Sequence, residues 1–99
     1  MDFGMQTGTF YFNEHTHPTQ WNLSSLTGPR TFRVTIKFPQ PFGGPPQLAV
    51  ALTGSDAANT ANLRIWIGTE DIEVGEFDLV VNTWDDTLIY GISGVWIAE

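Results

Sequence analysis

Hydrophobic and polar residues alternate most regularly over residues 31–38. The apolar side chains from Phe32 to Phe38 occupy every second position, and threonine, arginine and lysine occupy the positions between them. A period of two predicts a β-strand with one buried and one solvated face. Pro39 follows directly, and because proline cannot donate to a β-ladder, we expect the strand to end there.

Turn-forming residues divide the rest of the chain into further short segments. We predict additional strands over residues 7–13, 47–53, 63–69, 75–83 and 88–98. The spacing of an amphipathic helix is absent, and only residues 57–61 could hold one helical turn. Short strands separated by regular turns predict an all-β fold, a six-stranded antiparallel β-sandwich. Residues 14–27 form a long polar loop, and loops of this length in compact domains are often functional.

The last of these segments differs from the others because neither of its alternating sets is polar. One set is Ile89, Gly91, Ser93, Val95 and Ile97, and the other is Tyr90, Ile92, Gly94, Trp96 and Ala98. A strand that is apolar on both sides is usually covered on both faces. In a small single domain, we expect one of these faces to meet another subunit.

Length and charge limit the classes of function. The 99 residues fit one domain over residues 1–99, without a linker or internal repeat. Four basic and eleven acidic residues give a net charge of −7. Residues 65–99 contain eight acids and no Lys or Arg, so Arg64 is the last cation of the chain. This balance argues against nucleic acid or an anionic membrane as a partner.

Cysteine usage and hydropathy exclude further classes. The chain has no cysteine, which excludes disulfides, thiolate metal sites and cysteine nucleophiles. No apolar run approaches the length of a membrane span, so we expect no membrane insertion. The N-terminus lacks the basic and apolar regions of a signal peptide. Localisation therefore stays open between the cytoplasm, non-classical secretion and a leader that has been removed.

Metal binding and catalysis have weak support. His15 and His17, with Glu14, offer possible metal ligands, but three adjacent residues are a poor signal and an exposed loop explains them equally well. Asp85 and Asp86 offer oxygen ligands for calcium, which needs six to eight, and aspartates are also favoured in a type I turn between strands. Paired carboxylates also serve glycosidases, but the chain is short for a cleft. We expect no cofactor, no metal and no enzyme activity.

A second constellation has the composition of a sugar site. Asn62, Arg64, Trp84 and Tyr90 combine an amide, a guanidinium group and two aromatic rings, and Asp85 adds a carboxylate. Sugar hydroxyls both donate and accept hydrogen bonds, and arginine offers five donors in a planar fork. An aromatic ring can cover the apolar C–H face of a pyranose. The alternative is that the aromatics belong to the core or an interface, and that Arg64 is a solvated partner of nearby acids.

Several short motifs follow one another in order over residues 31–99. They are Phe38-x-x-Pro41-Phe42-x-x-Pro45-Pro46, Asn62-Leu63-Arg64, Gly75-x-Phe77, Thr83-Trp84-x-x-Thr87-x-x-Tyr90 and Trp96-Ile97-Ala98. Together they resemble the H-type lectin domain, the family of the Helix snail agglutinin and the C-terminal domain of the discoidins.

The resemblance implies a fold, an assembly and a ligand. It implies a six-stranded antiparallel β-sandwich that forms a homotrimer and binds glycans with terminal N-acetylgalactosamine (GalNAc) or galactose, without a metal. Asn62 and Arg64 would come from one subunit, and Trp84, Asp85 and Tyr90 from its neighbour. The rival reading is a structural trimerising or attachment module without a sugar site.

The sequence departs from the family pattern in two places. Asp85 stands where the snail lectin has histidine, so an acceptor replaces an imidazole beside Arg64. Ser25 and Thr27 stand roughly where the first sugar-binding loop of the family carries glycine and aspartate. The resemblance therefore adds Ser25 and Thr27 to the candidate sugar-binding residues and leaves the exact sugar open.

Overall fold

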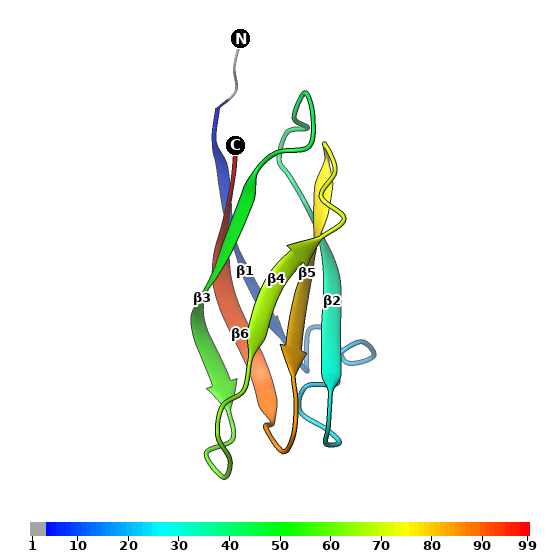
Figure 1. Ribbon diagram of the computed structural model, residues 1–99, viewed down its shortest axis with the longest axis vertical. Helices are drawn as coiled ribbons and strands as arrows, with labels where there is room; N and C mark the ends of the chain where they lie inside the picture. Colours follow the sequence, from blue (N-terminus) through cyan, green and yellow to red (C-terminus); the bar gives the residue numbers. More distant parts are fainter. Residues whose placement is uncertain (1–3) are drawn as a thin grey trace.

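The computed structural model describes residues 4–99 and consists of two antiparallel sheets. Its strands are β1 (Gln6–Asn13), β2 (Arg30–Lys37), β3 (Leu48–Ala57), β4 (Trp66–Glu70), β5 (Glu76–Thr83) and β6 (Ile89–Ala98). One sheet has the order β1-β6-β3 and the other has the order β2-β5-β4. Figure 1 shows them facing each other in an elongated sandwich. The predicted all-β antiparallel fold is confirmed; residues 1–3 of the predicted domain lie outside the described part.

Aromatic side chains join the two sheets in the core. Phe77 on β5 and Phe38 after β2 pack with Trp96 on β6, with ring centroids 5.4–6.0 Å apart. Such pairs contribute about 0.5–1.5 kcal/mol each beyond the area they bury. Gly8 on β1 makes room for this cluster, because a Cβ there would lie 2.4 Å from Nε1 of Trp96. Phe32 is also fully buried, which confirms the alternation predicted for β2.

The predicted strand over residues 63–69 begins too early. In the structure β4 starts at Trp66, and Asn62 and Arg64 lie in the preceding loop. Two threonine hydroxyls explain the difference, because they bind carbonyls that strand pairing would otherwise use. Oγ1 of Thr83 donates to the Arg64 carbonyl at 2.6 Å, and Oγ1 of Thr87 donates to the Asn62 carbonyl at 2.5 Å.

Two other local predictions need correction. Residues 57–61 hold no helical turn, because Ala57 ends β3 and a turn follows it. On β6 the strict alternation fails between Ile89 and Ile92, which are both buried. The pairing of β6 with β3 is irregular at Asp56 and Ala57, and this irregularity rotates Ile89 into the core.

The outer face of β6 is not covered within the chain. Its side chains Ser93 and Val95 are half-buried, and Ile97 is 43% exposed. The inner face of β6 is buried, and the expectation that another subunit meets the outer face stays a prediction. Among residues 4–99 no helix is long and apolar enough to cross a membrane.

Three loops meet at one end of the sandwich, the lower end in Figure 1. They are residues 14–29, 58–65 and 84–88, and backbone hydrogen bonds tie them together. The amide of Gly28 donates to Asp85, the amide of Ala58 to Leu88, and the amide of Ile89 to Leu23, at N–O distances of 2.8–2.9 Å. The long loop predicted over residues 14–27 is thus present and is packed against the β5–β6 loop.

An ionic cluster occupies part of the outer face of the β2-β5-β4 sheet. Nη1 of Arg33 donates to Oδ2 of Asp78 at 3.0 Å, and Oγ1 of Thr35 donates to Oδ1 of Asp78 at 2.7 Å. Arg33 also pairs with Glu70, and lies 3.6 Å from the Asp71 carboxylate. The Thr35 hydroxyl foremost, and then the Arg33 guanidinium, hold the pKa of Asp78 below its ordinary value.

The cluster predicts an acid-dependent contribution to stability. A carboxyl group whose pKa is lowered in the folded state stabilises the fold above its unfolded pKa of about 3.9, and this contribution is lost as the pH falls through the lower folded pKa. We expect Asp78→Asn to lower the free energy of unfolding by about 1 kcal/mol at pH 7. In urea titrations the deficit should shrink as the pH falls below about 4. Asp71→Asn, at a looser and more exposed contact, is the matched control. An equal deficit at every pH would contradict this role for the Asp78 carboxylate.

Candidate functional site

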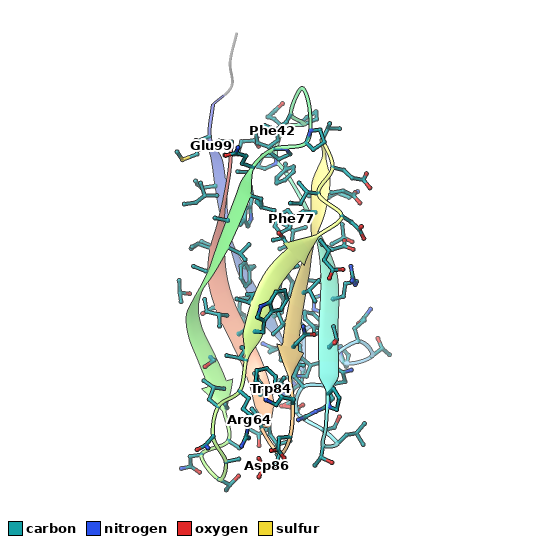
Figure 2. All side chains as sticks on the ribbon, in the orientation of Figure 1. Phe42, Arg64, Phe77, Trp84, Asp86 and Glu99 are labelled. Carbon is teal, nitrogen blue, oxygen red and sulfur yellow. The ribbon has the colours of Figure 1, made fainter. Side chains whose placement is uncertain are left out.

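The Arg64 guanidinium group lies at the centre of the loop end. Nη1 donates to Oδ1 of Asp86 at 2.9 Å and to Oγ1 of Thr87 at 3.1 Å, and Nη2 lies 3.7 Å from Oδ2 of Asp85. Arg64 comes from the β3–β4 loop and its partners from the β5–β6 loop, as the labelled side chains in Figure 2 show. The Arg64 side chain is only 24% exposed, so these contacts hold the guanidinium in one place.

This cluster offers both donors and acceptors to a ligand. Within the described residues, Nε and Nη2 of Arg64 make no hydrogen bond, so their N–H groups are available. The carboxylates of Asp85 and Asp86 are largely exposed and accept hydrogen bonds. A neutral ligand with several hydroxyl groups can therefore pair with both sides of the cluster.

Asp85 has an unusual backbone conformation. Its φ is 61°, in the left-handed region, where aspartate is better tolerated than most residues. Its carbonyl accepts the Gly28 amide at 2.9 Å and Nη2 of Arg30 at 2.9 Å. The predicted turn between β5 and β6 is present, but it is not a type I turn. Both central residues of a type I turn have negative φ, whereas Asp85 has a positive φ.

Arg30 organises the site, and sequence reasoning did not single it out. The side chain is 5% exposed and donates four hydrogen bonds of 2.9–3.3 Å. The acceptors are the backbone carbonyls of Gly28, Leu23, Ser25 and Asp85. Arg30 thus joins residues 14–29 to the β5–β6 loop. The alternation of residues in β2 could have indicated this position. Arg30 lies two residues before the buried Phe32, so its side chain should point to the same, inner face of the sheet.

Ser25 and Thr27 lie beside this cluster. Both are exposed, and together with Asp86 and Leu88 they line an open hollow at the loop end. The carbonyl of Ser25 is held by Arg30 at 3.1 Å, and the hydroxyl groups of Ser25 and Thr27 make no hydrogen bond within residues 4–99. The structure therefore brings these two candidates to the acidic side of the Arg64 site.

The two aromatic candidates are placed differently. Trp84 lines a separate groove, together with Trp66, on the outer face of the β2-β5-β4 sheet. Tyr90 lies on β6, where its carbonyl accepts the Glu14 amide at 3.2 Å. Within the described chain, neither ring makes a hydrogen bond or ring contact with Arg64. Asn62 is exposed, and its carbonyl is 3.4 Å from Nη1 of Arg64. A single chain thus assembles the polar part of the predicted site without its aromatic part.

The two histidines of the loop have different surroundings. His17 packs edge-on against Phe12 and Phe32, with centroid distances of 5.1 and 5.6 Å, so its side chain is half-buried. His15 is exposed. No group of three His, Cys, Asp or Glu side chains gathers at one point in residues 4–99.

The fold is a small antiparallel β-sandwich with a cluster of polar side chains between the loops at one end. A model of the H-type lectin domain matches residues 33–98, and the chain belongs to this family. Its six-stranded fold and the motifs described above agree with this assignment. The family and its structural neighbours support a lectin-like carbohydrate-binding module.

Two solved structures and one curated relative are similar to the chain. Both structures are discoidin II of Dictyostelium discoideum, one of them the recombinant protein, and each has a TM-score of 0.82 and 26% identity to this chain. They cover 96% of this chain and 36% and 35% of discoidin II. The relative is "ATP synthase subunits region ORF 7" of Fuscovulum blasticum, 38% identical over 71 residues. That match covers 72% of this chain and 62% of the relative, so the chain spans less than two thirds of either protein.

Proposed function

We propose that the chain is a lectin that binds terminal GalNAc or galactose at the Arg64 site, without metal and without catalysis. The observation that carries the proposal is the pairing of free guanidinium donors with two exposed carboxylates at the loop end. A sugar ring presents neighbouring hydroxyls that donate and accept, and charge-assisted hydrogen bonds to them are stronger than neutral ones. Single-site affinity is expected to be weak, because the site is open rather than a deep pocket.

The Asp86 carboxylate supports the choice of a galactose-type sugar. Thr27 stands roughly where the family pattern has an aspartate, and a hydroxyl there is a weaker acceptor for the axial hydroxyl of galactose than a carboxylate. Asp86 lines the same hollow as Ser25 and Thr27 and can supply an acceptor there. Asp85 adds a second acceptor next to Arg64, where the snail lectin has histidine.

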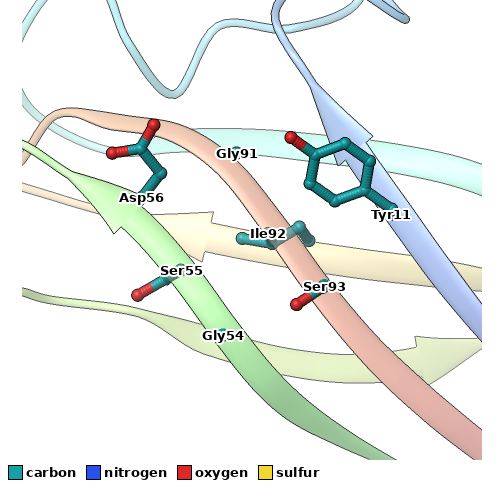
Figure 3. Close-up of a pocket in the computed structure, with 7 residues that line it drawn as sticks. All are labelled: Tyr11, Gly54, Ser55, Asp56, Gly91, Ile92 and Ser93. Carbon is teal, nitrogen blue, oxygen red and sulfur yellow. The ribbon is translucent and has the colours of Figure 1, made fainter.

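We further propose that the module is a homotrimer with sites between subunits. The exposed outer face of the β1-β6-β3 sheet, which includes Val95 and Ile97, is a suitable subunit contact. A hollow of about 160 Å³ on this face could take a neighbouring side chain. Figure 3 shows Gly91 of β6 between the side chains of Tyr11 and Asp56, which line the hollow. A second subunit would bring Trp84 and Tyr90 to the Arg64 site, which lacks an aromatic surface in the single chain.

A glycan array tests this function directly. The labelled protein should bind glycans with terminal GalNAc or galactose, free GalNAc should compete, and the chelator EDTA should leave binding intact. Three sites per trimer would raise the avidity on multivalent glycans. The mass in solution, measured by light scattering, should be that of a trimer. A blank array from a folded trimer would favour the structural or attachment module instead, and loss of binding in EDTA would favour a metal site.

A further inference from the structure

Two tryptophans stand on the surface away from the Arg64 cluster. Trp66 is 48% exposed and Trp84 is 44% exposed, whereas Trp21 and Trp96 are buried. The two exposed rings line one groove of about 490 Å³ on the outer face of the β2-β5-β4 sheet. Large exposed aromatic rings that share a concave surface indicate a binding site rather than ordinary surface.

Strand register explains why the groove forms. Trp66 on β4 pairs with Asn82 on β5, and Asn82 pairs with Thr31 on β2, so these residues form one row across the sheet. Trp84 follows Asn82 by two positions, which places it near the same face. The groove is therefore built across all three strands of this sheet.

Gly68 provides the place where the Trp66 ring lies. A Cβ at Gly68 would be 2.3 Å from Cη2 of Trp66, so the indole lies over the backbone of β4 at this glycine. About half of the Trp66 side chain remains exposed and can contact a ligand. An exposed indole can cover the apolar face of a sugar ring.

The polar groups of the groove are neutral. Oγ1 of Thr31 donates to Oδ1 of Asn82 at 2.6 Å, and within the described residues the Asn82 amide nitrogen makes no hydrogen bond and can donate to a ligand. Arg30 also lines the groove, but its guanidinium is directed to four backbone carbonyls. An anionic ligand finds no free cation here, and a net charge of −7 opposes it. A neutral ligand with both hydroxyl groups and an apolar face fits these features.

We propose that this groove is a second sugar subsite, which holds the residue next to the terminal sugar. The inference rests on the proposed function, because it takes the Arg64 site, completed by Trp84 of a neighbouring subunit, as the place of the terminal sugar. Trp84 also lines the groove, so the groove would lie directly beside a terminal sugar bound at that site. Contact with the Trp66 ring would then make the lectin bind an oligosaccharide more tightly than a single sugar.

Calorimetric titration with two kinds of probe tests the subsite. The probes are the methyl glycoside of GalNAc and a panel of neutral disaccharides that end in GalNAc. We expect the best disaccharide to bind about tenfold more tightly than the monosaccharide, as one stacked ring would give. Trp66→Ala should remove most of this preference and leave monosaccharide affinity unchanged. Gly68→Ala should act in the same direction, because it displaces the ring. Gly44→Ala, where a Cβ meets nothing within 4 Å, is the matched control.

A spectroscopic readout places the ligand. In proton–nitrogen correlation spectra the indole signals of Trp66 and Trp84 should shift with the disaccharide. The signal of Trp21 should not, because its Nε1 donates to the buried Ile89 carbonyl at 2.9 Å. Melting curves of each variant confirm that it is folded.

The outcomes separate this inference from the proposed function. If the protein binds the monosaccharide but prefers no disaccharide, or if Trp66→Ala leaves the preference unchanged, the subsite is wrong and the Arg64 site stands. If the folded protein binds neither probe, both proposals fail. If a second subunit covers the groove, oligomerisation of the protein would depend on Trp66. That result would also overturn the subsite.

Discussion

Replacement of Arg64 by alanine is expected to abolish sugar binding while the fold and the assembly persist. Two charge-assisted hydrogen bonds from the guanidinium to the ligand correspond to a loss of affinity of at least about 100-fold. The structural cost should be only about 1 kcal/mol, because the carboxylates of Asp85 and Asp86 are exposed and become hydrated when their partner is removed. Calorimetry with the methyl glycoside of GalNAc, together with light scattering, measures both effects.

A second substitution at the same position refines the test. Arg64→Lys keeps the positive charge but lacks the planar fork, so we expect it to recover only a small part of the affinity. An unchanged titration of the alanine variant would exclude Arg64 from the site. In that case the surviving binding would have to come from another part of the surface.

Replacement of Arg30 by methionine is expected to destabilise the protein and disorganise the site. Four backbone carbonyls each lose a hydrogen bond. Those of Leu23 and Asp85 keep a backbone amide donor, whereas those of Gly28 and Ser25 are left without one among the described residues, at a total cost of about 3 kcal/mol or more. For a domain of this length the melting temperature should fall by about 10 °C or more. Sugar affinity should fall as well, because Arg30 holds the loop that carries Ser25 and the backbone of Asp85.

Controls distinguish this positioning role from a general loss of charge. Arg30→Lys should lower the melting temperature and the sugar affinity nearly as much as Arg30→Met, since one ammonium group cannot reach all four carbonyls. Arg33→Met, on the exposed face of the same strand, should shift the melting temperature much less. Below the melting transition of the Arg30 variants, amide signals of residues 23–28 and 84–88 should move while those of the sheets stay in place. Wild-type melting of Arg30→Met would show that the loops do not depend on this side chain.

The strands were predictable where the pattern was strictly local. Residues 31–38 alternate cleanly, and β2 has the expected buried face and ends before Pro39. The start of β4 was not predictable, because it depends on the hydroxyls of Thr83 and Thr87, which come later in the chain and compete for carbonyls. The break in alternation at Ile89 likewise depends on an irregular pairing with β3. A pattern of residue types does not contain such long-range hydrogen bonds.

The candidate site likewise has a part that the sequence indicated and a part that it did not. The sequence pointed to Arg64 and to nearby acids, and the structure places its guanidinium group beside Asp85 and Asp86, while its role in sugar binding stays a prediction. The motifs indicated the family that the match over residues 33–98 confirms. The sequence did not distinguish Asp86, which makes the closest side-chain contact with Arg64 at 2.9 Å. It also did not show that the Trp84 ring lies with Trp66 rather than against Arg64 in the single chain.

By itself, the sequence determined the strand periodicity, the absence of helices and thiols, the negative charge and the family, because each of these depends on residue type and local spacing. The tertiary structure alone decided which side chains meet. The sheet orders β1-β6-β3 and β2-β5-β4 bring three loops to one end, where Arg30 is buried against carbonyls and Arg64 reaches Asp86. The pairing of β4 with β5 places Trp66 beside Asn82. These contacts join segments far apart along the chain, and they arise only when the sheets pack and the loops satisfy their backbone groups.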